Sequence, residues 1–179
     1  VLLLHLMTGC NDSARMLSDG TLQQLDSMVY KYPRYVNNRV VLLSRQNTST
    51  YNQAYLGLLK VISEDNFGMK FSSDSLINRV TNEFAANPEL LPRNYLRSLI
   101  YQGIVRYNMG ITDSRAYQPV KNALDRENEL HVLDTRTLQL ANYYLATIHN
   151  RNNNITISHE YFRKALVLAE ALNDSTVLF

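Results

Sequence analysis

The sequence has no tryptophan, one cysteine, six glycines and four prolines among its 179 residues. A single cysteine excludes an intramolecular disulfide and any CxxC redox or zinc motif. Because glycine and proline interrupt regular structure, their scarcity favours long helices over many short strands. No apolar run approaches the roughly 20 residues that a membrane-spanning helix needs. The net charge is only +2, so we expect no nucleic-acid binding by this chain.

The apolar residues of the sequence follow a helical spacing. Apolar residues recur at spacings of three and four, as in Leu22, Leu25 and Val29, which places them on one face of a helix. The apolar–polar alternation of a half-buried strand is missing. We therefore expect an all-α fold, with helices over about 21–30, 36–45, 49–63, 74–86, 93–109, 114–128, 135–149 and 158–172.

Several residues mark expected helix ends. Pro33 is expected to stop the first helix, and Gly110 to form a C-terminal cap. Asp134 and Ser158 are expected to be N-caps, because their side-chain oxygens accept hydrogen bonds from the first backbone amides of a helix. Each expected helix pair is too small to bury its own apolar face.

Two of these pairs can be overlaid without a gap. Tyr101 then falls on Tyr143, Ala116 on Ser158, and Ala123 on Ala165, with an offset of 42 residues. Self-similarity on this scale is typical of stacked helical repeats.

The second of these pairs resembles the tetratricopeptide repeat (TPR). "LATIH" is similar to the first helix of that repeat, with His149 in the aromatic position. "SHEYFRKALVLAE" is similar to the second helix, where Ser158, Phe162 and Ala165 meet the neighbouring helix. The first pair departs from the pattern, since Gly103 stands where leucine is usual in this overlay. The resemblance implies antiparallel helix pairs stacked as a TPR-like α-solenoid.

The first ten residues have a different character. Val1 to Met7 is apolar except for His5, and "LMTGC" ends at Cys10. This order resembles the lipobox of bacterial lipoproteins, although leucine is usual where Met7 stands. The resemblance implies that Cys10 carries a lipid that holds the chain at a membrane, with the polar stretch after it as a tether. The alternative is that the apolar run forms the first turns of a buried helix.

A longer stretch, from residue 51 to 175, resembles the tetratricopeptide lipoproteins of Bacteroidetes, in which a lipobox precedes a helical array. The sharpest local match is "SDSLIN". The expected organisation is a signal-peptide remnant with lipobox at 1–10, a tether at 11–18, divergent helical repeats at 19–92, and TPR-like repeats at 93–179, divided into 93–130 and 134–173.

The function expected from these resemblances is a membrane-anchored scaffold in the cell envelope, facing the periplasm or the outside. It would bind a protein or peptide partner in its concave groove, as the sensing part of an envelope regulator. A glycan- or nutrient-binding lipoprotein is the alternative. We expect no enzyme, cofactor or metal site, because no phosphate loop, HExxH or GxSxG motif is present. Three Asp-Ser-apolar triplets resemble O-glycosylation sites of Bacteroidales, a weak pattern that Asp-Ser helix starts also produce.

In tetratricopeptide arrays the first helix of each pair lines the concave side. The residues of these helices that are not needed for packing are therefore candidates for partner binding. Tyrosine, asparagine and arginine are suited to hold a peptide through ring contacts and hydrogen bonds. The alternative for Tyr101 and Tyr143 is packing between neighbouring helices. The candidates are Tyr101, Val105, Asn108, Met109, Tyr143, Thr147, Asn150 and Arg151.

Overall fold

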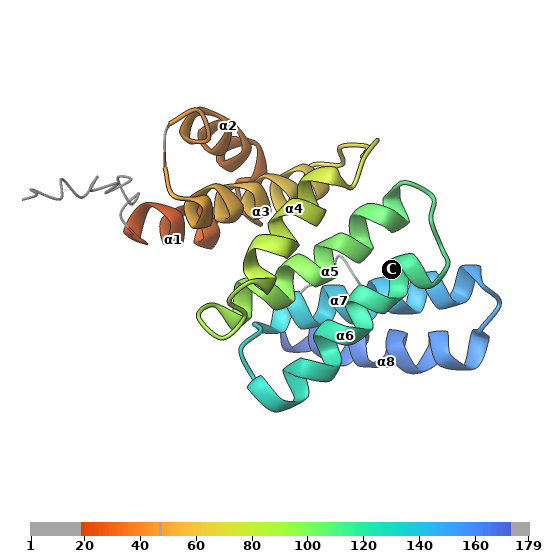
Figure 1. Ribbon diagram of the computed structural model, residues 1–179. Coiled ribbons are helices and arrows are strands. Elements are labelled where there is room, and N and C mark those ends of the chain that lie inside the picture. Colours follow the sequence, from red (N-terminus) through yellow and green to blue (C-terminus); the bar gives the residue numbers. More distant parts are fainter. Residues whose placement is uncertain (1–18, 47, 173–179) are drawn as a thin grey trace, which may run out of the picture.

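The computed structural model describes residues 19–46 and 48–172, which form eight α-helices and no strand (Figure 1). The all-helical prediction is confirmed for these residues, whereas Cys10 and the expected tether lie outside them. None of the described helices combines the length and apolarity needed to cross a membrane. The helices are α1 (Asp19–Met28), α2 (Pro33–Leu43), α3 (Thr50–Asn66), α4 (Ser75–Ala85), α5 (Pro92–Asn108), α6 (Ser114–Leu130), α7 (Thr135–Arg151) and α8 (Ile155–Ala171).

The helix ends confirm two of the four expected signals. Asp134 is the N-cap of α7 and accepts a 2.8 Å hydrogen bond from the Thr137 amide, and Gly110 follows α5 with a φ of 90°. Pro33 does not stop the first helix: α1 ends at Met28, and Pro33 is the first residue of α2, where its missing amide hydrogen needs no partner. The Ser158 prediction is wrong: the chain enters α8 at Ile155, so Ser158 lies inside the helix and is buried.

The contacts between helices define two sets. Every helix packs against the next one along the chain, and α1, α3, α5 and α7 also contact one another in succession. Among the described helices, no two even-numbered helices make such contacts. The odd-numbered helices therefore lie side by side in one layer, and α2, α4 and α6 each pack against two neighbouring helices of this layer.

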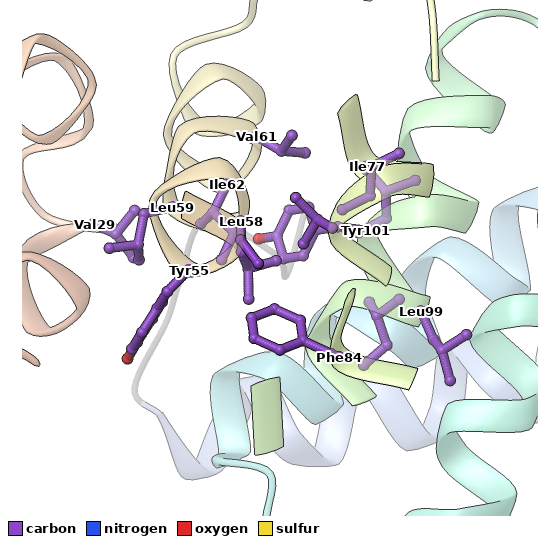
Figure 2. Close-up of a cluster of buried hydrophobic side chains, with 14 of the residues drawn as sticks. Val29, Tyr55, Leu58, Leu59, Val61, Ile62, Ile77, Phe84, Leu99 and Tyr101 are labelled. Carbon is purple, nitrogen blue, oxygen red and sulfur yellow. The ribbon is translucent and has the colours of Figure 1, made fainter. Parts of the chain in front are cut away.

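The core lies mainly between α3, α4 and α5. Val61 of α3, Ile77 and Phe84 of α4 and Tyr101 of α5 belong to this cluster, and Leu59 of α3 lies beside Val29, which follows α1 (Figure 2). These side chains are almost fully removed from water. Burial of this kind stabilises a fold by about 1.5–3 kcal/mol for each large apolar side chain.

A close approach between α5 and α6 depends on Gly103. A Cβ atom at this position would lie 2.4 Å from the carbonyl oxygen of Ala116 and 2.3 Å from Cγ2 of Val120. Gly57 approaches Val80 of α4 in the same way. α3 and α5 thus each carry a glycine where they touch the helix that follows.

The overlay of Tyr101 on Tyr143 is wrong by one residue. Counted from the first residue of each helix, Tyr101 in α5 corresponds to Tyr144 in α7. Gly103 then corresponds to Ala146, so a small residue faces the second helix in both pairs. The gap-free overlay failed because the turn after α5, at 109–113, is longer than the turn after α7, at 152–154.

His149 packs among aromatic rings. Its ring lies 5.9 Å from the ring of Tyr161 with an interplanar angle of 4°, and 5.4 Å from the ring of Tyr117. Partial burial lowers the pKa of His149, so the neutral imidazole is favoured. Its place between α6 and α8 is consistent with a packing role.

Candidate binding face on the odd-numbered helices

Tyrosines occupy one equivalent position in three odd-numbered helices. Each lies two residues before a small residue of the same helix: Tyr55 before Gly57, Tyr101 before Gly103, and Tyr144 before Ala146. The Tyr55 hydroxyl donates a 2.9 Å hydrogen bond to Asp26 of α1, and that of Tyr101 lies 3.4 Å from the Tyr30 hydroxyl. The Tyr144 hydroxyl interacts with Asp65 of α3. Each tyrosine thus reaches a residue on or just after an earlier odd-numbered helix.

One polar cluster is centred on Asp26. The Arg97 guanidinium donates to both Asp26 oxygens at 2.8 Å, and Arg93 donates to Asp26 at 2.8 Å and to Asp134 at 2.9 Å. Burial raises the pKa of Asp26, but the arginines and the Tyr55 hydroxyl outweigh it and hold this pKa below its usual value. Two carboxylates and two guanidinium groups balance in charge, and we call these four residues with Tyr55 the Asp26 cluster.

The Asp26 cluster joins helices that are not neighbours in the layer. Asp26 of α1 pairs with Arg97 of α5, although α3 lies between them. Packed helices are about 8–10 Å apart, so in a flat layer α1 and α5 would be beyond the reach of these side chains. The layer of odd-numbered helices is therefore not flat, and we call the exposed surface of these helices the odd-helix face.

A second polar cluster lies near the C-terminal end of α5, and we call it the Asp65 site. Asn108 donates a 2.8 Å hydrogen bond to Oδ1 of Asp65, and Tyr144 reaches the same carboxyl group from α7. Burial raises the pKa of Asp65 to about 6, although both hydrogen bonds act in the opposite direction. No lysine or arginine of the described ranges forms an ion pair with Asp65, in contrast to Asp26.

Aromatic rings continue from the Asp65 site across α7. Tyr144 makes edge-to-face contacts with Tyr107 at 5.6 Å and with Tyr143 at 5.7 Å between ring centroids. Tyr143 in turn lies 6.0 Å from Phe162 of α8. The Arg151 guanidinium stacks over the Tyr107 ring at 4.8 Å. Tyr143 is 39% exposed, so this aromatic run reaches the surface.

The structure divides the predicted binding residues into three groups. Tyr101 and Val105 are fully buried, so they cannot contact a partner in this conformation, and Tyr101 takes the packing role named as its alternative. Met109 is partly buried against the core. The others retain exposed surface, and their role in binding stays a prediction; they are Asn108, Tyr143, Thr147, Asn150 and Arg151.

Five important residues of the odd-helix face were not predicted. Arg97 had a detectable signal, since a charged residue between Leu96 and Leu99 on an apolar face requires a buried counter-charge. No local signal in the sequence indicated the other four, because their partners are distant in the sequence; they are Asp26, Asp65, Tyr107 and Tyr144.

Comparison with protein-family models, with curated proteins and with solved structures finds no match for this chain. The resemblance to tetratricopeptide lipoproteins therefore stays a prediction from the sequence.

Proposed function

We propose that the chain is a TPR-like α-solenoid that binds a protein or peptide segment on its odd-helix face. Stacked helix pairs curve into extended concave surfaces of the kind that hold peptides. The succession of contacts α1–α3–α5–α7 supports this architecture, as do the equivalent tyrosines and the ion pairs that span α3. This role needs no catalytic group, and we propose that the chain is not an enzyme.

One observation carries the assignment to peptide binding: an aromatic run ends at the exposed ring of Tyr143. Tyrosine supplies contact area at small entropic cost, since it has few rotatable bonds. Arg151 and Asn108 lie on the same helices and have donors suited to backbone carbonyls or a carboxylate. The surface therefore combines ring contacts with directional hydrogen bonds.

Replacing Tyr143 by alanine is expected to weaken peptide binding by about tenfold, because truncation of an aromatic anchor commonly costs more than 1 kcal/mol. The probe is a fluorescent peptide selected on the unaltered protein from a randomised dodecapeptide library, and the measurement is fluorescence anisotropy. Tyr35→Ala is the matched control, since Tyr35 is 52% exposed on the even-numbered helix α2. Equal losses of peptide affinity in both variants would contradict a binding site on the odd-helix face.

We also propose that a lipid on Cys10 holds the chain at the cell envelope, facing the periplasm or the outside, as the sensing part of an envelope regulator. Support comes only from the "LMTGC" sequence and the polar residues after it. Two acyl chains anchor stably, whereas one binds reversibly.

Exchange of Cys10 for serine, in a protein expressed with a complete lipoprotein signal peptide, is expected to abolish labelling with an alkyne fatty acid and to release the protein from the membrane fraction. Serine is nearly isosteric but supplies no thiol for a thioether. Asn11→Ser, next to the cysteine, is the matched control and is expected to label normally. Equal labelling of the Cys10→Ser variant would exclude this anchor.

A further inference from the structure

We infer that the Asp65 site binds a basic side chain, a lysine ammonium or an arginine guanidinium, of a peptide lying on the odd-helix face. This inference rests on the proposed function and names the chemistry of the partner. It identifies Asp65 as the residue that selects for that chemistry.

The difference in charge between the two clusters is the first argument. The Asp26 cluster is balanced, because Arg93 and Arg97 neutralise Asp26 and Asp134. Asp65 has only neutral hydrogen-bond donors, the amide of Asn108 and the hydroxyl of Tyr144. A half-buried carboxylate without a cation is electrostatically incomplete, so a cationic ligand gains a desolvated ion pair there.

The position of the carboxylate is the second argument. Asp65 belongs to α3, its donors belong to α5 and α7, and all three helices are in the odd-numbered layer. The hydrogen bond from Asn108 holds one carboxylate oxygen in place, which prepares the group for a ligand. A carboxylate on one helix that is held by donors from two others is suited to a segment that crosses all three.

The aromatic surroundings are the third argument. The Tyr144 ring, whose hydroxyl reaches Asp65, meets the Tyr107 ring edge to face. Aromatic faces attract ammonium and guanidinium groups, and this chain already makes such a contact where Arg151 stacks over Tyr107. The methylene groups of a lysine or arginine of the partner would pack on these rings while its charged end reaches Asp65.

Ionisation of Asp65 makes the binding depend on pH. The titratable groups that interact with Asp65 from other helices are Tyr101 of α5 and Tyr144 of α7, and burial raises the pKa of both far above neutrality. The neighbouring Glu64 on α3 pairs with Lys60. Because the pKa of Asp65 is about 6, most of its carboxyl group is ionised at pH 7.5 and protonated at pH 5.

The test is selection from a randomised dodecapeptide library that is N-acetylated and contains no histidine, so that the peptides keep their charge between pH 5 and 7.5. Selection is made on the unaltered protein, on Asp65→Asn and on Asp125→Asn. Asparagine retains an acceptor for Asn108, so Asp65→Asn is expected to fold, and thermal melting followed by circular dichroism verifies this. Asp125 is an exposed carboxylate on α6 paired with Lys121, which makes it a matched control.

The unaltered protein and Asp125→Asn are expected to enrich peptides with a lysine or arginine at one position. Asp65→Asn should bind those peptides at least tenfold more weakly. The affinity of the unaltered protein for them should fall about tenfold between pH 7.5 and pH 5. Enriched peptides without a basic preference, or with undiminished affinity for Asp65→Asn, would overturn the inference and leave the proposed function standing. If no peptide is enriched at all, both are overturned.

Discussion

Asp26→Ala is expected to lower the free energy of unfolding by about 3–5 kcal/mol, because it leaves the buried Arg97 without its counter-charge. Arg97 has no exposed side-chain surface, and a guanidinium group cannot lose its proton in a protein. The Tyr55 hydroxyl loses its acceptor in the same variant. Urea denaturation followed by circular dichroism measures the change.

Two further variants distinguish the stability cost of an uncompensated buried charge from the cost of losing an ion pair. Asp125→Ala removes an exposed pair with Lys121 and is expected to change stability by no more than about 0.5 kcal/mol. The double variant Asp26→Asn with Arg97→Met leaves no buried charge, so it is expected to be more stable than Asp26→Ala. A double variant as unstable as Asp26→Ala would show that the uncompensated charge is not the cause.

The Asp26 cluster also determines how stability responds to acid. The pKa of Asp26 in the folded protein lies below its usual value of 3.8. Its contribution is therefore fully present above about pH 4 and is lost as the pH falls through the folded pKa. Below about pH 4, the unaltered protein is expected to lose stability more steeply than the double variant.

Gly103→Ala is expected to lower the free energy of unfolding by about 3 kcal/mol, at the upper end of the usual cost of overpacking. The new Cβ would lie 2.4 Å from the backbone oxygen of Ala116, and a backbone atom cannot move aside as a flexible side chain does. α5 and α6 must separate, which disturbs the burial of Val120 and Ala123.

Gly20→Ala is the matched control for this substitution. Gly20 is exposed in α1, and nothing lies within 4 Å of the position where its Cβ would stand. Because alanine favours helix more than glycine does, this variant is expected to be as stable as the unaltered protein or up to about 1 kcal/mol more stable. A Gly103→Ala protein that melts like Gly20→Ala would contradict the close approach of α5 to α6.

The helices were predictable because their signals are local. The spacing of Leu22, Leu25 and Val29 and the capping side chain of Asp134 operate within a few residues. Ser158 was misleading because it has the chemistry of an N-cap but serves as a small contact residue inside α8. Only the environment of Ser158 distinguishes these roles.

The odd-helix face was less predictable, because a shift of one residue changes which side chains it presents. The gap-free overlay chose Tyr143 as the counterpart of Tyr101, whereas the turn lengths make it Tyr144. Asp26 meets Arg97 across α3, and Asp65 meets Tyr144 across α5, so neither contact follows from a local pattern. Contacts of this kind depend on the curvature of the whole layer.

The most direct test of peptide binding on the odd-helix face is an NMR spectrum of the protein with isotope-labelled tyrosine rings, recorded with and without a selected dodecapeptide. The ring signals of Tyr107, Tyr143 and Tyr144 are expected to shift, while those of Tyr32 and Tyr35, exposed at and near the start of α2, stay in place. Shifts confined to Tyr32 and Tyr35, with the three odd-helix tyrosines unchanged, would contradict the proposed binding face.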